Sequence, residues 1–160
     1  MSPGSWRKFA YDGFDWFNPQ LHKDAVEEAK TKVKKVNEPI VASDIDQSVL
    51  EIAKVNAHNA GVLQDIYFKQ LAIKDFATDL KNGIIIANPP YGKRLKDRES
   101  AESLYKQMGE VFKPYSSFNQ YFLVGDPNFE KCFGRRANKK RKLFNGNLRV
   151  DFYQFWANKK

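Results

Sequence analysis

Short apolar runs alternate with segments of helical periodicity along most of this chain. Each run is bounded by turn-forming residues, which is typical of strands buried in a parallel sheet. The runs cover residues 40–42, 66–71, 84–87 and 121–125. Before the first run and between later ones, apolar residues recur at helical spacing over 21–36, 49–61 and 99–112. This alternation predicts an α/β fold built on a parallel sheet.

The run over 84–87 ends in Asn88-Pro89-Pro90-Tyr91-Gly92. Its continuous apolar character predicts a central strand that is covered on both faces. Because proline lacks a backbone N–H and has a fixed φ, the strand must end at Asn88. Asn88 then lies at the carboxyl end of a parallel strand, where open α/β sheets bind their ligands. The residue before a proline is held extended, so we expect a rigid tip.

This tip carries the groups needed to hold a planar exocyclic amino group. The Asn88 side-chain carbonyl and the Pro89 backbone carbonyl can accept its two hydrogens. Withdrawing density from the N–H bonds then lets the nitrogen lone pair attack a methyl donor. The Tyr91 ring offers a face on which a flipped base can stack. The alternative is a Pro-Pro turn that merely ends a core strand.

The run over 40–42 leads into Asp44 at the predicted strand end, and a helix follows immediately. Asp46 or Ser48 is placed to cap that helix, and Gly61 is placed to end it. An acidic residue at such a strand end can bridge the two hydroxyls of a ribose, as in nucleoside-binding α/β units. The alternative is that Asp44 is simply a turn residue.

Before residue 40 we expect two further features. Aromatic residues interleaved with Gly, Pro and Asp over 1–19 indicate an irregular segment that packs its rings on a core, or else stacks a base. A helix is then predicted from Leu21 to Val36, with Ala25, Ala29 and Val33 on its apolar face.

Composition places the chain among soluble, folded proteins. Its 160 residues suit one domain, and 42% hydrophobic with 14% aromatic residues argue against disorder. The single cysteine, Cys132, excludes an internal disulfide and fits a reducing compartment. No apolar run approaches the ~20 residues of a membrane span, and the start lacks an apolar leader. We therefore predict a cytoplasmic location and no membrane partner, and we predict no metal site.

The net charge of +8 favours a polyanionic partner. Seven of the eight residues over 135–142 can donate hydrogen bonds to phosphate. The turn signal Asn145-Gly146 then separates two β-like runs and predicts a C-terminal antiparallel hairpin with a cationic entry strand. The block is either a nucleic-acid contact or a solvated charged face.

Asn88-Pro89-Pro90-Tyr91 resembles the signature of S-adenosylmethionine-dependent amino-methyltransferases, which act on adenine N6, guanine N2 or glutamine amides. The segment from Asp44 to Ser48 resembles the second motif of class I methyltransferases. That resemblance implies that Asp44 binds the ribose of S-adenosylmethionine and that Ile45 packs on its adenine. In many such enzymes an acidic residue just after the third strand contacts the adenine amino group. This chain has Ala72 at that position, and Gln70 or Asp75 could make the contact instead.

Residues 3–16, the Asp44 motif, residues 88–95 and the Asn145-Gly146 hairpin together resemble the bacterial 23S rRNA guanine-N2 methyltransferases that carry a THUMP domain. The resemblance implies a Rossmann-like class I sheet, S-adenosylmethionine as cofactor and ribosomal RNA as partner. Adenine-N6 methylation of DNA remains the alternative. The resemblance to the guanine-N2 methyltransferases implies that Asn88, Pro89, Pro90 and Tyr91 are catalytic and that Asn88 also contacts the cofactor. The residues that we expect to contact nucleic acid are Lys93, Arg94, Arg135, Arg136, Lys139, Lys140, Arg141 and Lys142.

The family's Gly-rich first motif and its THUMP domain have no counterpart in these 160 residues. The expected strand order is third, second, first, fourth, fifth, seventh, sixth. The missing first strand would therefore lie between the strands that end at Asp44 and Asn88. We expect residues 1–160 to be a partial catalytic domain whose partner is the missing N-terminal half. By itself the chain would have little catalysis, or would be an inactive basic RNA-binding remnant.

Overall fold

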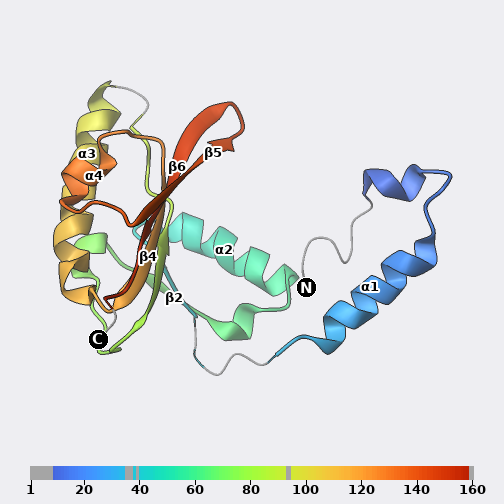
Figure 1. Ribbon diagram of the computed structural model, residues 1–160. Helices are drawn as coiled ribbons and strands as arrows, with labels where there is room; N and C mark the ends of the chain where they lie inside the picture. The colour runs from blue at the N-terminus through green and yellow to red at the C-terminus, as the bar shows by residue number, and fades with distance from the viewer. Residues whose placement is uncertain (1–8, 35–37, 39, 93–94, 159–160) are drawn as a thin grey trace. The chain divides into compact units, whose positions relative to one another are not determined.

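A computed structural model describes residues 9–34, 38, 40–92 and 95–158 of the chain. It divides into two compact units, an N-terminal unit of residues 1–72 and a C-terminal unit of residues 73–160. Figure 1 labels their helices and strands. Each unit is an α/β arrangement in its own right, and each is described separately below. None of the described helices is long and apolar enough to cross a membrane.

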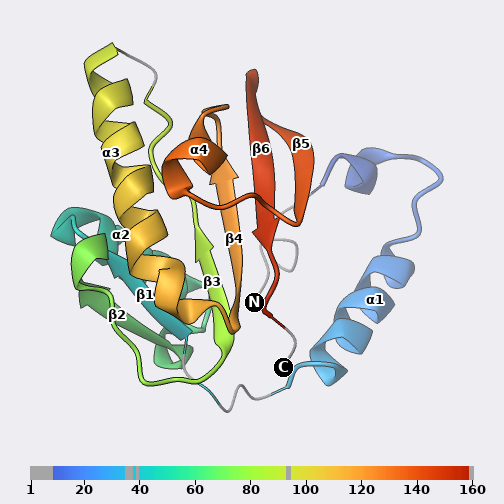
Figure 2. The same cartoon turned by 60° about the vertical axis from the view of Figure 1, so that its left-hand side comes forward.

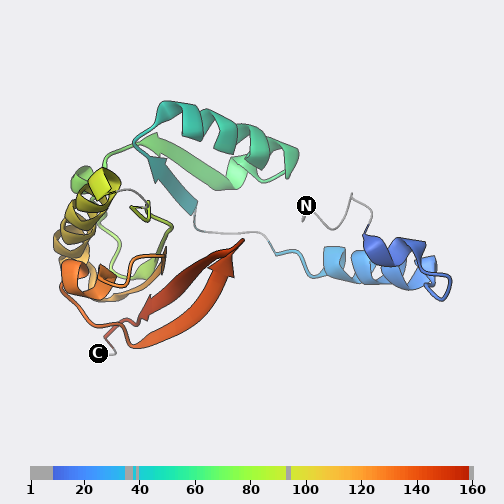
Figure 3. The same ribbon diagram turned by 90° about the horizontal axis from the view of Figure 1, so that it is seen from above.

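The N-terminal unit contains a parallel two-stranded sheet and two helices. Strand β1 pairs with β2 in a register that runs from Ile40 opposite Ile66 to Asp44 opposite Gln70. Figure 3 shows helix α2 lying against these two strands. The elements are η2 (Ala10–Gly13), α1 (Pro19–Thr31), β1 (Ile40–Asp44), α2 (Gln47–Asn59), η3 (Leu63–Asp65) and β2 (Ile66–Gln70).

The turn from β1 into α2 follows the sequence prediction closely. Asp46 is the N-cap of α2, because its side chain accepts a 2.8 Å hydrogen bond from the Ser48 backbone N–H. Gly61 follows the helix with a φ of 70°, a conformation that suits glycine. Leu50 and Ala57 are the buried residues of this helix. The predicted cap and stop are therefore confirmed.

Two other predictions for this unit are wrong. Helix α1 ends at Thr31, short of Val36, which lies outside the described residues; no residue of α1 is buried and Val33 is 78% exposed. The described aromatic rings before it contact one another instead of a core. Phe9 and Tyr11 stack with their ring centroids 5.3 Å apart, and Trp16 is exposed. The spacing of apolar and charged residues predicted that a helix forms here. It could not predict whether another element covers the apolar face of that helix.

The C-terminal unit holds a four-stranded mixed sheet in the order β3-β4-β6-β5. Strands β3 and β4 are parallel, and β6 runs antiparallel to both of its neighbours. Figure 2 shows α3 and α4 on one side of this sheet. The elements are η4 (Ile73–Asp75), β3 (Gly83–Ala87), α3 (Leu95–Phe112), η5 (Lys113–Tyr115), β4 (Phe118–Val124), α4 (Phe129–Phe133), β5 (Lys139–Asn145) and β6 (Leu148–Phe155).

The core of this unit is mainly aromatic and lies between the helices and the sheet. Phe122 from β4 has ring contacts with Phe112 of α3, Phe129 of α4 and Phe155 of β6. Each fully buried ring of this kind contributes roughly 2–3 kcal/mol relative to an exposed one. The buried cluster consists of Ala101, Tyr105, Met108, Phe112, Phe122, Val124, Phe129, Phe133, Tyr153 and Phe155.

The predicted hairpin is confirmed, and so is the predicted strand order within each of the two sheets. Gly146 lies between β5 and β6 with a φ of 60°, as an Asn-Gly hairpin turn requires. Counted in the expected numbering, β2-β1 gives the third and second strands, and β3-β4-β6-β5 gives the fourth, fifth, seventh and sixth. The fold is thus α/β, with a mixed sheet in the C-terminal unit, as the sequence predicts.

The burial predicted for two strands is wrong. Strand β3 pairs only with β4 among the described strands, so it is an edge strand and not a central one. Ile85 and Ala87 pack on the core, whereas Ile84 and Ile86 are 65% and 74% exposed on the other face. In β1, Ile40 and Val41 are likewise exposed. Both strands carry apolar side chains on faces that no described element of their own unit covers.

Candidate active site

The tip that follows β3 presents an ordered carboxamide. Asn88 is exposed at the carboxyl end of the strand, whereas Pro89 is buried. The Tyr91 hydroxyl donates a 2.6 Å hydrogen bond to Asn88 Oδ1. Sequence reasoning did not predict this bond, which holds the amide in one orientation. A carbonyl oxygen has two lone pairs, so Asn88 Oδ1 can still accept a second hydrogen bond.

The backbone of this tip is held from helix α3. Tyr105, which is fully buried, donates a 2.6 Å hydrogen bond from its hydroxyl to the Pro90 carbonyl oxygen. Burial raises the pKa of Tyr105, and the charge of the nearby Asp126 raises it further. The hydroxyl therefore remains a proton donor throughout the neutral range. Sequence analysis missed Tyr105, although its spacing from Ala101 and Met108 indicates one helical face.

Two glycines let the chain pass closely around the tip. Gly92 has a φ of 61°, and a Cβ there would lie 2.7 Å from the Arg98 Cα. Gly125, at the end of β4, lies against the Tyr91 ring, where a Cβ would be 3.2 Å from Cγ. Any larger residue at these positions would displace the tip. The sequence motif of residues 88–92 includes Gly92, but it gave no indication of the role of Gly125.

A cavity of about 520 Å³ adjoins the tip. Pro90, Tyr91 and Gly92 line one side of it, and α3 contributes Ala101 and Leu104 on the other. Its size lies within the range of small-molecule sites, and its apolar and aromatic lining suits a flat ring. The cavity can therefore receive a nucleobase-sized group next to Tyr91, whose hydroxyl bonds to Asn88, although Asn88 itself is not among the lining residues.

A second cluster lies in the N-terminal unit, at the carboxyl ends of β1 and β2. Asp44 Oδ1 accepts a 2.9 Å hydrogen bond from the Asp46 N–H. Gln70 Nε2 donates a 3.0 Å hydrogen bond to the Ile45 carbonyl, and the Leu71 N–H donates to the Asp44 carbonyl at 2.9 Å. The structure thus brings together three of the residues predicted for the cofactor, Asp44, Ile45 and Gln70.

These residues fit the nucleoside end of S-adenosylmethionine. Asp44 Oδ2 has no hydrogen bond within the described part of the chain, so it is available to ribose hydroxyls. Ile45 is 70% exposed and offers an apolar surface to an adenine ring. Gln70 uses one N–H of its amide to hold the Ile45 carbonyl, which leaves its second N–H and its oxygen for a ligand. Asp75 is exposed in η4 of the C-terminal unit, and its role stays a prediction.

The basic block does not form a single surface. Four of its cations, Lys139, Lys140, Arg141 and Lys142, lie on the outer strand β5, where successive side chains point to opposite faces of the sheet. Lys140 Nζ lies 3.5 Å from Glu130 Oε2 and 5.3 Å from the centre of the Tyr153 ring. Lys139 and Arg141 are exposed on the other face.

The remaining predicted nucleic-acid contacts differ in exposure. Arg135 is half-buried, with its guanidinium carbon 4.5 Å from the centre of the Phe155 ring. Arg136 is exposed. Lys93 and Arg94 lie outside the described residues. The sequence alone could not separate these cases, because a run of cations carries no information about which side chains pack on rings.

A parallel strand that ends in a fixed Asn-Pro-Pro-Tyr tip, with an aspartate at the end of another parallel strand, defines the class of α/β methyltransferases. Comparison with known families agrees with this class. Residues 1–154 match the model of the RMKL-like methyltransferase domain. The chain therefore belongs to the RMKL-like methyltransferase domain family.

Three relatives illustrate the match. YpsC of Bacillus subtilis (strain 168), named as an RNA methyltransferase, is 43% identical over 98% of this chain. A protein named ribosomal RNA large subunit methyltransferase K/L, from Shewanella baltica (strain OS195), is 34% identical over 99% of this chain. The solved structure of SMU.472, named as a methyltransferase and complexed with SAH (S-adenosylhomocysteine), is 40% identical over 99% of this chain, with a TM-score of 0.86.

The chain spans less than half the length of each of these relatives. It covers 41% of YpsC, 23% of the K/L methyltransferase and 42% of the SMU.472 chain. The family implies S-adenosylmethionine as the methyl donor, and SAH is what remains of that donor after methyl transfer.

Proposed function

We propose that this protein is part of an S-adenosylmethionine-dependent methyltransferase that modifies an exocyclic amino group of ribosomal RNA, namely guanine N2 of 23S rRNA. The observation that carries the proposal is the Asn88 carboxamide, which is oriented by Tyr91, a residue that also lines a cavity of nucleobase size. The names of two relatives favour RNA over DNA. Adenine N6 remains the competing target, because the same tip can hold either amino group.

The residues of the tip divide the work of the reaction. Asn88 Oδ1 and the Pro89 carbonyl accept the two hydrogens of the target amino group, so its nitrogen lone pair points away from them. The Tyr91 ring stacks the base, and its hydroxyl keeps the Asn88 amide from rotating. When bound, S-adenosylmethionine supplies an electrophilic methyl group. The amino nitrogen that Asn88 and Pro89 hold would take this methyl group, with the sulfur keeping the electron pair of its bond to the methyl carbon, and would give up one proton to water.

The two ligand-binding tips need elements that these residues do not supply. Strands β1 and β3 each have one edge without a partner among the described strands, and Ile84 and Ile86 are exposed on β3. We infer that one further parallel strand, from the rest of a longer protein, pairs with both edges. Residues 1–160 are then a partial catalytic domain. We propose that the N-terminal half of the enzyme supplies this strand, the Gly-rich loop and the THUMP domain.

The experiment that tests this function uses the chain complemented with the N-terminal half of a relative. Asn88→Ala should abolish methylation of a 23S rRNA fragment and leave S-adenosylmethionine binding, measured by calorimetry, nearly unchanged. Asn147→Ala, at the exposed hairpin turn, is the matched control and should methylate normally. Equal loss of methylation and of cofactor binding in Asn88→Ala would contradict this division of roles.

The modified nucleoside identifies the target base. Nuclease digestion and mass spectrometry should find N2-methylguanosine in the 23S rRNA fragment. Recovery of N6-methyladenine from a DNA substrate, with unmodified RNA, would favour the competing assignment.

The isolated chain provides a further discrimination. If it binds S-adenosylmethionine at micromolar concentration, the inference that the missing strand is needed is wrong. If it binds an RNA hairpin but no cofactor even after complementation, a non-catalytic RNA-binding role replaces the enzymatic one.

A further inference from the structure

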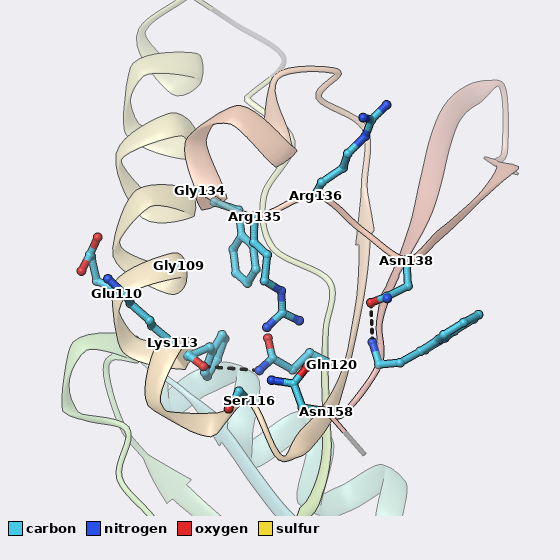
Figure 4. A pocket seen from close by; sticks show the side chains of 13 residues that line it. Gly109, Glu110, Lys113, Ser116, Gln120, Gly134, Arg135, Arg136, Asn138 and Asn158 are labelled. Carbon is cyan, nitrogen blue, oxygen red and sulfur yellow. Dashed lines mark hydrogen bonds between the residues drawn. The ribbon is translucent and has the colours of Figure 1, made fainter. Parts of the chain in front are cut away.

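A second cavity in the C-terminal unit has no part in the proposed methyl transfer. It has a volume of about 450 Å³ and lies between α3, α4 and the ends of β4 and β6 (Figure 4). None of its lining residues belongs to the Asn88 tip or to the cavity beside it. Its size is within the range of nucleotide and drug-sized sites.

A buried acceptor faces this cavity without a partner. Gln120 is 0% exposed, and its Nε2 donates to the carbonyls of Phe112 and Tyr115, at 3.3 and 3.0 Å. These two bonds fix which end of the amide points into the cavity. Gln120 Oε1 has no hydrogen-bond partner in the described residues. A buried polar atom left unpaired costs roughly 1–3 kcal/mol, so a donor that reaches it is bound favourably.

A cation lies beside that acceptor. Figure 4 shows Arg135 and Gln120 pointing toward one another from opposite walls. The Arg135 guanidinium packs on Phe155, and no described carboxylate lies within ion-pair distance of it. Burial lowers the pKa of Arg135, which is the direction expected for a cation removed from water without a counter-charge. The walls thus present fixed hydrogen-bond donors next to a fixed acceptor.

Nucleobases match this pairing. The guanine edge places the O6 acceptor next to the N1–H donor, which suits Arg135 and Gln120 Oε1 respectively. Phe112, Phe133 and Trp156 also line the cavity and provide ring surface for a flat ligand. Lys113 lines it as well and can pair with a phosphate, whereas Glu110 would repel phosphate from its own side. Figure 4 shows the Arg136 side chain pointing away from Arg135 and Gln120.

We propose that this cavity is a nucleotide-binding site, separate from the methyl-transfer tip, in which Gln120 and Arg135 read the base edge and Lys113 holds the phosphate. The ligand is either a free mononucleotide or a nucleotide of a bound RNA strand. The site stands independently of the proposed catalysis, because it shares no residue with it.

Calorimetry of the 160-residue chain with guanosine 5′-monophosphate tests the proposal. We expect binding in the millimolar range or tighter, weakened about tenfold in Arg135→Met, since one charge-assisted hydrogen bond is worth about 1.4 kcal/mol or more. Arg149→Met removes the same charge from an exposed position of β6 and should bind like the wild type. Absence of binding, or equal weakening in both variants, overturns the proposal.

Three further ligands show whether the site binds the base, the phosphate or a nucleotide within an RNA strand. Guanosine and inorganic phosphate should each bind more weakly than the complete nucleotide; phosphate binding as tightly as the nucleotide would refute base recognition. A short single-stranded RNA that binds more tightly than the mononucleotide identifies the RNA strand as the source.

The Gln120 side chain reports binding without any substitution. Its Nε2 proton resonances should shift when guanosine 5′-monophosphate is added, because the ligand bonds to the same amide. Shifts confined to the backbone of β5 would place the nucleotide on the basic strand and overturn the assignment.

Discussion

The bond from Tyr105 to Pro90 allows a quantitative test of how the Asn88 tip is held. Tyr105→Phe removes the hydroxyl that donates to the Pro90 carbonyl and leaves the ring in the core. A hydrogen bond of this kind contributes about 0.5–1.5 kcal/mol net. Because Pro90 is exposed, its carbonyl can bond to water once the hydroxyl is gone. We therefore expect a loss of about 1 kcal/mol, and not the larger cost of an unpaired buried group.

Tyr153→Phe is the matched control. Both tyrosines are 0% exposed, but the Tyr153 hydroxyl has no hydrogen-bond partner in the described residues. Its removal relieves a buried unpaired group, so Tyr153→Phe should be neutral or should stabilise the chain by up to about 1 kcal/mol. The two substitutions delete the same atom, and any general effect of losing a hydroxyl cancels between them.

Urea denaturation, with β4 amide hydrogen exchange as a second measure, gives both free energies. An effect of about 1 kcal/mol corresponds to roughly a fivefold change in the unfolding equilibrium. Tyr105→Phe should also broaden or shift the Asn88 side-chain amide resonance in NMR spectra. Equal destabilisation by the two substitutions, or an unchanged Asn88 resonance in Tyr105→Phe, would refute the idea that Tyr105 fixes the tip.

Three other predictions concern the same unit. Gly92→Ala places a Cβ 2.7 Å from the Arg98 backbone at a φ of 61°, so we expect a loss of about 1–3 kcal/mol in urea denaturation, with Gly13→Ala, which meets no atom within 4 Å, as control. Burial raises the pKa of Tyr153 to about 12, against about 10 in an unfolded chain. The native state then holds this proton more tightly, so stability should be constant below about pH 10 and fall as the pH rises toward 12; Tyr153→Phe should fall less steeply. The double substitution of Lys139 and Arg141 to alanine should lower the salt slope of single-stranded RNA binding by about 1.4, from two phosphate contacts at about 0.7 each, and an unchanged slope would remove β5 from the RNA surface.

The sequence predicted the order of elements well because local chemistry determines it. Two prolines ended β3, Asp46 capped α2 and Asn145-Gly146 formed the hairpin, each by restricting its own backbone. Burial was harder, since Ile84 and Ile85 are chemically identical and differ only in what covers each face. The bond between Tyr91 and Asn88 was also hidden, although both residues were recognised.

Residues that act over long sequence distances were not found. Tyr105 supports the tip from 15 positions away, and its partner is a backbone carbonyl that no side-chain motif reveals. Gln120 gave no signal either, since a glutamine inside a strand carries no mark of an unpaired oxygen. The basic block shows a different limit: its cations follow one another in the sequence, but the alternation of strand side chains divides those of β5 between two faces of the sheet.

The edge of β3 that pairs with no described strand affects how this polypeptide behaves in solution. A row of unpaired backbone N–H and C=O groups flanked by exposed isoleucines is a template onto which any extended apolar segment can add. At high concentration, other copies of the chain can pair with this edge. We therefore expect copies of the chain to associate increasingly as the concentration rises. A short peptide that pairs with β3 as a parallel strand should suppress this association.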